Sequence, residues 1–212
     1  GDDGMGKWMD GYLERLDRVR AENLTGGGDD RLDIQRGLGK LTARERISRL
    51  VDAGSFEEIG SLVTDSRPPF DGNSRLCPSD GVVMGFGKIH SRMVALCAMD
   101  FSIMSGSLGD QAAWKLADMV EMAGQKRMPL ICMFDSAGLR IGIKGGDCGL
   151  SGLGRFIRNY SLYSGVIPRI SLVLGPCTGL MAAVAALSDF LIMREDAAFL
   201  WYGGAKESDD AG

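Results

Sequence analysis

Two short apolar runs, each followed at once by a glycine-bearing turn, constrain the fold of this chain most strongly. The run at 130–134 leads into a turn at 135–140, and the run at 170–174 leads into a turn at 175–180. Runs of this length and apolarity are typical of buried strands, and glycine allows the backbone to turn tightly where each strand ends. We therefore expect two parallel strands whose turns lie at the same edge of a sheet.

Strand-like and helix-like segments alternate along the rest of the chain. A hairpin is predicted from 81–87 and 93–99, with its turn near His90. Alternating strands and helices require crossover connections, which produce a mostly parallel α/β sheet. The later elements are expected in this order: helix 111–124, strand 130–134, helix 153–163, strand 169–174, helix 179–188 and strand 190–193.

Residues 1–30 have the pattern of an N-terminal helical arm. Apolar and aromatic side chains recur at helical spacing through 8–20, which predicts an amphipathic helix that packs on something outside itself. Glycine and acidic residues at 25–30 predict a linker. A second helix is expected after Thr42, whose capping box includes Glu45. We therefore divide the chain into an arm, 1–30, and a domain, 31–212.

The composition argues against several classes of function. The 212 residues carry a net charge of −4, so there is no basic excess for binding nucleic acid. The longest apolar stretch, 180–187, is too short to cross a bilayer. Five cysteines form no C-x-x-C pair and there is one histidine, so we expect no metal site. Free cysteines favour a reducing compartment, cytoplasmic or, in a eukaryote, the mitochondrial matrix.

The two turns predict a site for an oxyanion. Helix 179–188 is small and apolar, so it can be buried with its free N–H groups aimed at a ligand. Ala137 and Gly138 occupy the corresponding position after the first strand. Backbone donors that converge on one point stabilise negative charge on a single oxygen, as in a thioester enolate. For either turn alone, a tight connection without a ligand is the alternative.

Two other enzyme classes are compatible with these residues. A serine protease of the Clp type would need Ser136 or Ser107 beside His90, although a turn histidine is usually exposed and Ser136 can serve the turn itself. A hydratase or isomerase would need carboxylates at the pocket. Aspartates next to turns more often act as caps. The available carboxylates are Asp110, Asp135 and Asp147.

A series of short motifs runs from about residue 31 to 204. They are GKLTARERI at 39–47, DAGSF at 52–56, DGVV at 80–83, DF at 100–101 with GSLG at 106–109, DSAG at 135–138 with Arg140, GVIP at 165–168, GPC at 175–177 with Gly179, and SD at 188–189. In this order they resemble the beta-type carboxyltransferase subunits of biotin-dependent acyl-CoA carboxylases and decarboxylases. Examples are propionyl-CoA carboxylase beta and the alpha subunits of methylmalonyl-CoA and glutaconyl-CoA decarboxylases. The match covers the N-terminal half of such subunits, so 31–212 is expected to be a carboxyltransferase domain that is incomplete at its C-terminal end.

The resemblance implies a crotonase-like or ClpP-like fold of repeated ββα units that binds an acyl-CoA thioester. In that family carboxylate moves between biotin and the α-carbon of the acyl group, and backbone amides hold the enolate. Carried over by motif, the catalytic positions are Ala137, Gly138, Gly179 and Leu180. The substrate-binding positions are Gly106, Ser107, Leu108, Gly109, Ser136, Arg140, Gly175 and Cys177.

The resemblance also implies partners. The chain has no Met-Lys-Met biotinylation motif, so biotin is expected on another chain or domain. A biotin carrier protein and biotin carboxylase or decarboxylase subunits would join it in a homo- or hetero-oligomer. Lys144, Arg155 and Arg158 are candidates for the CoA phosphates, or belong to solvated surface. Open alternatives are decarboxylation of a glutaconyl, methylmalonyl or malonyl ester, and a non-catalytic scaffold subunit.

Three positions depart from the pattern of the family. The family usually has glycine where this chain has Ala137 and Leu180, and a small residue where it has Leu139. Each replacement keeps the backbone N–H but adds a side chain that narrows the pocket. The segment 141–144 replaces a more acidic and amide-bearing continuation. These departures predict an unusual acyl group or weakened catalysis.

Overall fold

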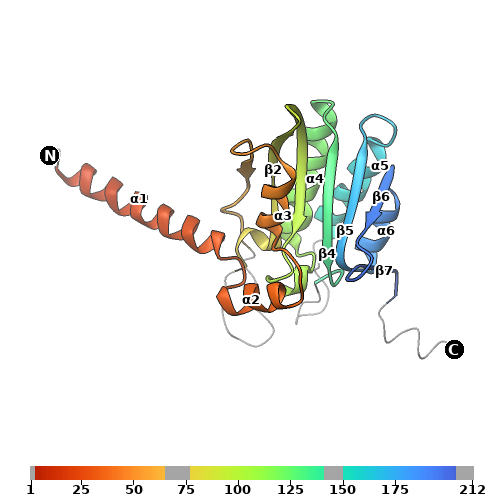
Figure 1. Cartoon of the computed structure of the whole chain (residues 1–212). Coiled ribbons are helices and arrows are strands. Elements are labelled where there is room, and N and C mark those ends of the chain that lie inside the picture. Colours follow the sequence, from red (N-terminus) through yellow and green to blue (C-terminus); the bar gives the residue numbers. More distant parts are fainter. Residues whose placement is uncertain (1–2, 65–76, 141–149, 204–212) are drawn as a thin grey trace.

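The computed structural model describes residues 3–64, 77–140 and 150–203, which form a twisted sheet with helices on both faces (Figure 1). The strands are β1 Glu57–Ile59, β2 Val82–Ile89, β3 Arg92–Met99, β4 Leu130–Ser136, β5 Arg169–Thr178, β6 Phe190–Met193 and β7 Phe199–Trp201. Their order in the sheet is β1-β2-β3-β4-β5-β6, and β7 pairs with the end of β5. The pairs β1–β2 and β2–β3 are antiparallel, and the later pairs are parallel.

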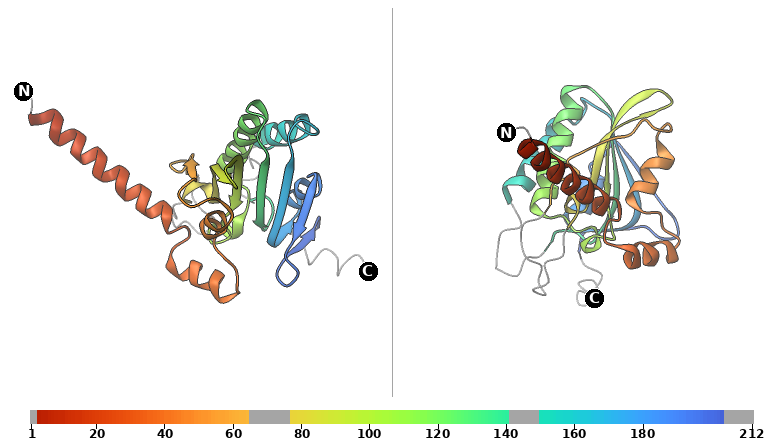
Figure 2. Two further views of the ribbon diagram at one scale, coloured as in Figure 1. Left: turned by 45° about the horizontal axis from the view of Figure 1, so that its top comes forward. Right: turned by 90° about the vertical axis from the view of Figure 1, so that its left-hand side faces the viewer.

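The helices cover the two faces of the sheet unequally. They are α1 Asp3–Leu24, α2 Asp29–Gly37, α3 Ala43–Leu50, α4 Asp110–Gln125, α5 Leu150–Leu162 and α6 Leu180–Ala186. Figure 2 shows α4, in green, and α3, in orange, on opposite sides of the sheet. The larger core lies between the sheet and α4, α5 and α6, and a smaller core lies under α3.

Alternation along the strands divides the side chains between the two cores. In β4, Leu130, Cys132 and Phe134 belong to the larger core, whereas Ile131 and Met133 belong to the smaller one. A period of two follows from the pleat of a strand, and burial on both faces explains why the run is continuously apolar. The central strands are therefore held from both sides where they approach the turns.

The predicted α/β fold is confirmed, and the hairpin β2–β3 followed by α4 is one of the expected ββα units. The capping box of Thr42 and Glu45 at the start of α3 is also confirmed. One turn was predicted too early, because β5 continues to Thr178. Pairing of 176–178 with β7 extends the strand, so the helix begins at Leu180. α2, β1 and β7 were not predicted.

The N-terminal helix α1 extends away from the body of the molecule (Figures 1 and 2). Trp8 and Tyr12 are 59% and 55% exposed, and their ring centroids lie 4.4 Å apart. The end of α1 is anchored by Asn23, whose Nδ2 donates to the Ser61 carbonyl at 2.5 Å. The proposed boundary at residue 30 falls inside α2. Among the described helices, none combines the length and apolarity needed to cross a membrane.

Candidate active site at the carboxyl ends of the central strands

The loop 104–109 lies against the first predicted turn. The Leu108 amide donates to the Gly138 carbonyl at 2.8 Å, and the Arg140 amide donates to the Leu108 carbonyl at 2.9 Å. The Ala137 amide donates to the Ser105 carbonyl at 3.0 Å. These backbone bonds form a short parallel bridge, so the loop and the turn form one layer beyond the end of β4.

The second predicted turn lies beside the first. Ser136 at the end of β4 is in register with Cys177 near the end of β5. Gly138 has φ 93°, and a Cβ placed on it would lie 3.2 Å from both the carbonyl and the hydroxyl oxygen of Thr178. Glycine is therefore suited to this position by its backbone conformation as well as by space. The two turns predicted to converge are neighbours in the structure.

Three of the four predicted oxyanion donors already have acceptors inside the protein. The Ala137 amide is bound to the Ser105 carbonyl, and the Gly179 amide donates to the Trp201 carbonyl at 2.8 Å. The Gly138 amide donates to Ser136 Oγ at 3.1 Å. The Leu180 amide, at the first position of α6, has no acceptor in the described part of the chain. Backbone pairing therefore occupies the amides of Ala137 and Gly179, whereas the amide of Gly138 is bound only to a hydroxyl and that of Leu180 to no described group.

Arg140, predicted to bind substrate, joins the turn to the loop. Its Nη2 donates to the Ser107 carbonyl at 2.9 Å and its Nε donates to Ser107 Oγ at 3.2 Å. Its Nη1 forms an ion pair with the buried carboxylate of Asp80. Asp80 also accepts from the Ala112 amide at 2.7 Å, which ties the first turn of α4 to the same group. The guanidinium thus holds the loop, the turn and α4 together.

The remaining predicted positions allow close packing around the two turns. A Cβ on Gly106 would collide with the Asp135 carbonyl, one on Gly109 would lie 2.5 Å from Arg140 Nη1, and one on Gly175 would collide with the Asp135 carboxylate. Leu108 and Cys177 are core residues. Burial, with a smaller effect of Asp135, raises the pKa of the Cys177 thiol to about 12. That thiol stays protonated and is no nucleophile.

Asp135 is the centre of a buried ion network that the sequence did not predict. Its carboxylate is fully buried and accepts from Lys40 Nζ at 2.8 Å, Arg46 Nη2 at 2.6 Å and Gln35 Nε2 at 2.9 Å. These donors come from α2, from the segment that follows it, and from α3. A buried carboxylate needs such partners because it loses its water. Asp135 therefore binds the N-terminal segment to the end of β4.

Lys40 and Arg46 have few contacts with water. Burial lowers the pKa of Lys40, and the Asp135 carboxylate opposes that change. Lys40 Nζ also lies 4.2 Å from the centre of the Phe101 ring. Arg46 Nη1 is buried and has no hydrogen-bond partner among the described residues. The cationic side of the network thus retains one unused donor.

The family of the chain follows from a match over most of its length. Residues 35–209 match the family model described as the carboxyl transferase domain. The chain belongs to the carboxyl transferase family.

Relatives of known function support the same assignment. The chain is 38% identical over 196 residues to the propionyl-CoA carboxylase beta chain of Roseobacter denitrificans, covering 92% of this chain and 38% of that protein. It is 35% identical over 192 residues to methylmalonyl-CoA decarboxylase subunit alpha of Propionigenium modestum, covering 91% of this chain and 37% of that protein. This carboxyl transferase chain therefore spans well under half the length of the relatives it matches.

A solved structure supports the fold as well as the family. The transcarboxylase 12S hexamer, with methylmalonyl-coenzyme A and methylmalonic acid bound, superposes with a TM-score of 0.85 at 35% identity. The match covers 95% of this chain and 39% of that one. The predicted resemblance to acyl-CoA carboxyltransferases and the predicted crotonase-like fold are both confirmed.

The geometry of the carboxyl transferase domain does not support a serine protease. His90 lies in the β2–β3 turn with φ 48°, at the start of β3. Met133 of β4 is level with Ala98 of the parallel strand β3, so Ser136 lies about eleven residues, or roughly 35 Å of extended strand, beyond His90. Ser136 Oγ accepts the Gly138 amide and thus serves the turn, as expected. Ser107 lies at the same end as Ser136, because its neighbour Leu108 pairs with Leu139 just beyond β4. Neither serine is beside His90, so the protease alternative is wrong.

The other chemical candidates are mostly engaged elsewhere. Asp135 is bound to two cations, whereas Asp110, at the start of α4, has a buried Oδ1 without a hydrogen-bond partner among the described residues. Arg155 forms ion pairs with Asp118 and Glu121 on α4, which fits the alternative of a surface cation. Asp147 and Lys144 lie outside the described residues. No group of three metal-ligating side chains occurs within the ranges that the structure describes.

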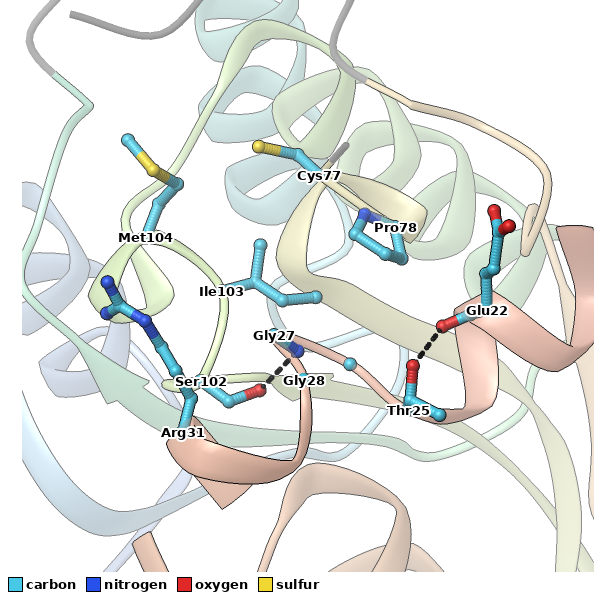
Figure 3. Close-up of a pocket in the computed structure, with 11 residues that line it drawn as sticks. Glu22, Thr25, Gly27, Gly28, Arg31, Cys77, Pro78, Ser102, Ile103 and Met104 are labelled. Carbon is cyan, nitrogen blue, oxygen red and sulfur yellow. Dashed lines mark hydrogen bonds between the residues drawn. The ribbon is translucent and has the colours of Figure 1, made fainter. Parts of the chain in front are cut away.

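A pocket of about 260 Å³ lies between the α1–α2 turn and the loop after β3 (Figure 3). Its walls include Cys77, Pro78, Ile103 and Met104, and the Gly27 amide donates to Ser102 Oγ at 3.0 Å beside it. Ligand pockets are usually about 300–1,000 Å³. None of the predicted site residues lines this small pocket, so it is distinct from the site at the turns.

One feature of the sequence could have indicated the ion network around Asp135. Asp135 directly follows an apolar strand that was predicted to be buried, and a buried carboxylate requires cations. Lys40 and Arg46 stand in the longest of the family motifs, which made them available candidates. Gln35 gave no such signal, because amide side chains occur throughout the surface of proteins.

Proposed function

We propose that this chain forms the acyl-CoA-binding part of a carboxyltransferase that moves carboxylate between biotin and the α-carbon of an acyl-CoA. The observation that carries the proposal is the meeting of loop 104–109 and the two turns at one sheet edge, in a chain of the carboxyl transferase family. An enolate forms when the α-carbon gains or loses carboxylate, and its charge lies on the thioester oxygen. A backbone donor at this edge would stabilise that charge.

The Leu180 amide is the strongest candidate for that donor. It lies at the start of α6 and has no acceptor among the described residues, so it can bind a ligand oxygen without breaking a protein bond. Gly138 is the second candidate, because its amide is bound only to the Ser136 hydroxyl, which can rotate. Ala137 is exposed and would border the acyl group with its methyl. Leu180 and Leu139 are half-buried against the larger core and would narrow the same space.

The described residues fit a thioester better than they fit biotin. The Leu180 amide, which has no acceptor among the described residues, suits the single oxygen on which the enolate charge develops. None of the described residues is proposed to bind the biotin ring. Biotin, carried by a carrier protein on another chain or domain, would supply the carboxylate or accept it. A biotin carboxylase or decarboxylase subunit would then complete the reaction cycle in an oligomer, in the cytoplasm or the mitochondrial matrix.

Replacement of Leu180 by proline tests the donor directly. Proline removes the N–H, yet it is tolerated at the first position of a helix. We expect Leu180→Pro to lower kcat for carboxylate exchange by about 10²–10³-fold, because one oxyanion donor is lost. The matched control, Leu180→Ala, keeps the N–H and should stay within about tenfold of the parent. The measurement is exchange between carboxylated acyl-CoA and free biotin, in the complete protein with its partners.

Equal activity of the proline and alanine variants would show that the Leu180 N–H is not the oxyanion donor. Absence of exchange in the parent protein, with acetyl-, propionyl- and longer acyl-CoA, would contradict the carboxyltransferase assignment. Acyl-CoA binding measured by calorimetry then separates a scaffold subunit, which binds nothing, from a site that binds without reacting.

Decarboxylation is the second candidate function. The 35% identity to methylmalonyl-CoA decarboxylase subunit alpha of Propionigenium modestum favours it specifically. Transfer of carboxylate from a carboxyacyl-CoA to biotin passes through the same transition state as the forward reaction, so the same donors would serve. Release of labelled carboxylate from glutaconyl-, methylmalonyl- or malonyl-CoA in the presence of biotin distinguishes the preferred direction.

A further inference from the structure

We infer that Asp135 is a positioning residue whose carboxylate fixes both turns of the candidate site relative to the N-terminal segment. This inference rests on the proposed function, since it assigns Asp135 a role in carboxyl transfer through the turn amides. Asp135 itself is fully buried and touches no ligand-accessible surface. It therefore acts on the reaction through other residues.

The carboxylate is fixed on one side by three donors from distant parts of the chain. Lys40 Nζ binds Oδ1, and Arg46 Nη2 and Gln35 Nε2 bind Oδ2, at distances of 2.6–2.9 Å. Because two cations and one amide bind its two oxygens, the carboxylate is held in one orientation. Charge-assisted bonds of this kind are shorter and stronger than neutral ones.

The other side of Asp135 lies directly against the two turns. Its carbonyl is packed on Gly106, and its carboxylate is packed on Gly175, at positions where neither glycine has space for a Cβ. The next residue, Ser136, accepts the Gly138 amide through its hydroxyl, and Ala137 is bound to Ser105. A change in the orientation of Asp135 would therefore move the loop, the first turn and the approach to the second turn together.

An ion pair at the far end of the neighbouring strand β5 provides a comparison, although its carboxylate, on Asp189, is 37% exposed whereas that of Asp135 is fully buried. Arg169, at the start of β5, is bound by Asp189 at 2.8 Å through its backbone amide and at 3.1 Å through its side chain. Its side chain is 5% exposed, as is that of Lys40. This pair lies at the end of β5 opposite to the turns, so loss of its charge affects stability without reaching the site.

The experiment compares Asp135→Asn with Asp189→Asn in the complete protein and its partners. Asparagine keeps the size of the side chain but removes the charge that holds two cations. We expect Asp135→Asn to lower kcat for carboxylate exchange by about 10²-fold with KM changed by less than about threefold, since small misplacement of catalytic groups has effects of this size. Asp189→Asn should lower stability while kcat stays within about threefold of the parent.

Amide hydrogen exchange supplies a readout that does not depend on activity. We expect faster exchange at 136–140 and 178–181 in Asp135→Asn and unchanged exchange there in Asp189→Asn. If the parent protein transfers no carboxylate, the proposed function fails while the exchange data still test positioning. Lys40→Met, which removes one cation and keeps Asp135, should give a smaller change of the same kind if Asp135→Asn does not fold. Parent-like exchange at both turns in every folded variant would overturn the inference.

Discussion

The charge state of Lys115 depends on the folded structure. Its side chain is buried, and Nζ donates to the carbonyls of Ser79 and Val82 at 2.8 and 2.5 Å. These carbonyls flank Asp80, the partner of Arg140, so the lysine supports the turn that holds the loop of the candidate site. Burial lowers the pKa of Lys115 from 10.5 to about 8.

The lowered pKa predicts stability that rises with pH. Between about pH 8 and 10.5 the unfolded chain keeps a proton on Lys115 that the folded chain has released. The free energy of unfolding therefore rises as pH increases through this interval. One pKa unit corresponds to about 1.4 kcal/mol, which gives roughly 3 kcal/mol over the whole interval. In urea unfolding, the free energy of unfolding of the parent should rise between pH 8 and pH 10 by about 2 kcal/mol more than that of Lys115→Met. Parallel pH profiles for the two proteins would contradict this account.

At the scale of elements, the approach of β4 to β5 decides where the candidate site forms. The register between the two strands shifts after Phe134, and Gly175 then lies on the Asp135 carboxylate. Gly175 has no unusual φ, so space and not backbone conformation requires glycine here. The end of β5 is therefore a packing surface as well as a strand.

A methyl group at Gly175 should lower stability. Gly175→Ala would force the Asp135 carboxylate and Lys40 to move, and overpacking of this kind costs about 1–3 kcal/mol. The control is Gly154→Ala in α5, where a Cβ meets nothing within 4 Å. Alanine is about 1 kcal/mol better than glycine inside a helix, so the control should become more stable. Denaturant unfolding measures both changes, and equal midpoints would show that Gly175 has more space than the structure gives it.

Local patterns predicted the elements well, whereas long-range pairing set their ends. The capping box of Thr42 and Glu45 was predictable because its partners are three residues apart. The extension of β5 to Thr178 was not, because it depends on pairing with β7 more than twenty residues later. α2 is polar and lacks a strong apolar face, and its Gln35 binds a carboxylate 100 residues away. Long-range pairing is also the reason why the motifs located the site residues but did not show that other backbone groups already bind some of their amides.

At the scale of the whole molecule, one edge of the sheet is strongly apolar. The four residues of β6 are 41–62% exposed, and Phe199, Trp201 and Tyr202 are also exposed beside them. The chain also spans only 38% of the length of its propionyl-CoA carboxylase relative. Exposed strands and large apolar patches of this kind tend to associate.

We expect this chain on its own to self-associate through the β6 edge. Sedimentation velocity should show an average mass that rises with concentration, and Phe190→Lys with Ile192→Lys should reduce that rise, since lysine on an edge strand opposes pairing. Gln125→Lys, at the exposed end of α4, adds one positive charge away from β6 and is the control for each single variant, Phe190→Lys and Ile192→Lys. A concentration-independent monomer in the parent chain would show that the exposed strand does not drive association.

The network around Asp135 also has a consequence for the order of events during synthesis on the ribosome. Lys40 precedes its carboxylate partner by 95 residues, and Gln35 precedes it by 100. At about 5–20 residues per second, roughly 5–20 s pass between the synthesis of Lys40 and that of Asp135. During this interval α2 and α3 have left the ribosome without the strand end that fixes them. The N-terminal segment is therefore made well before the strand end that fixes its position.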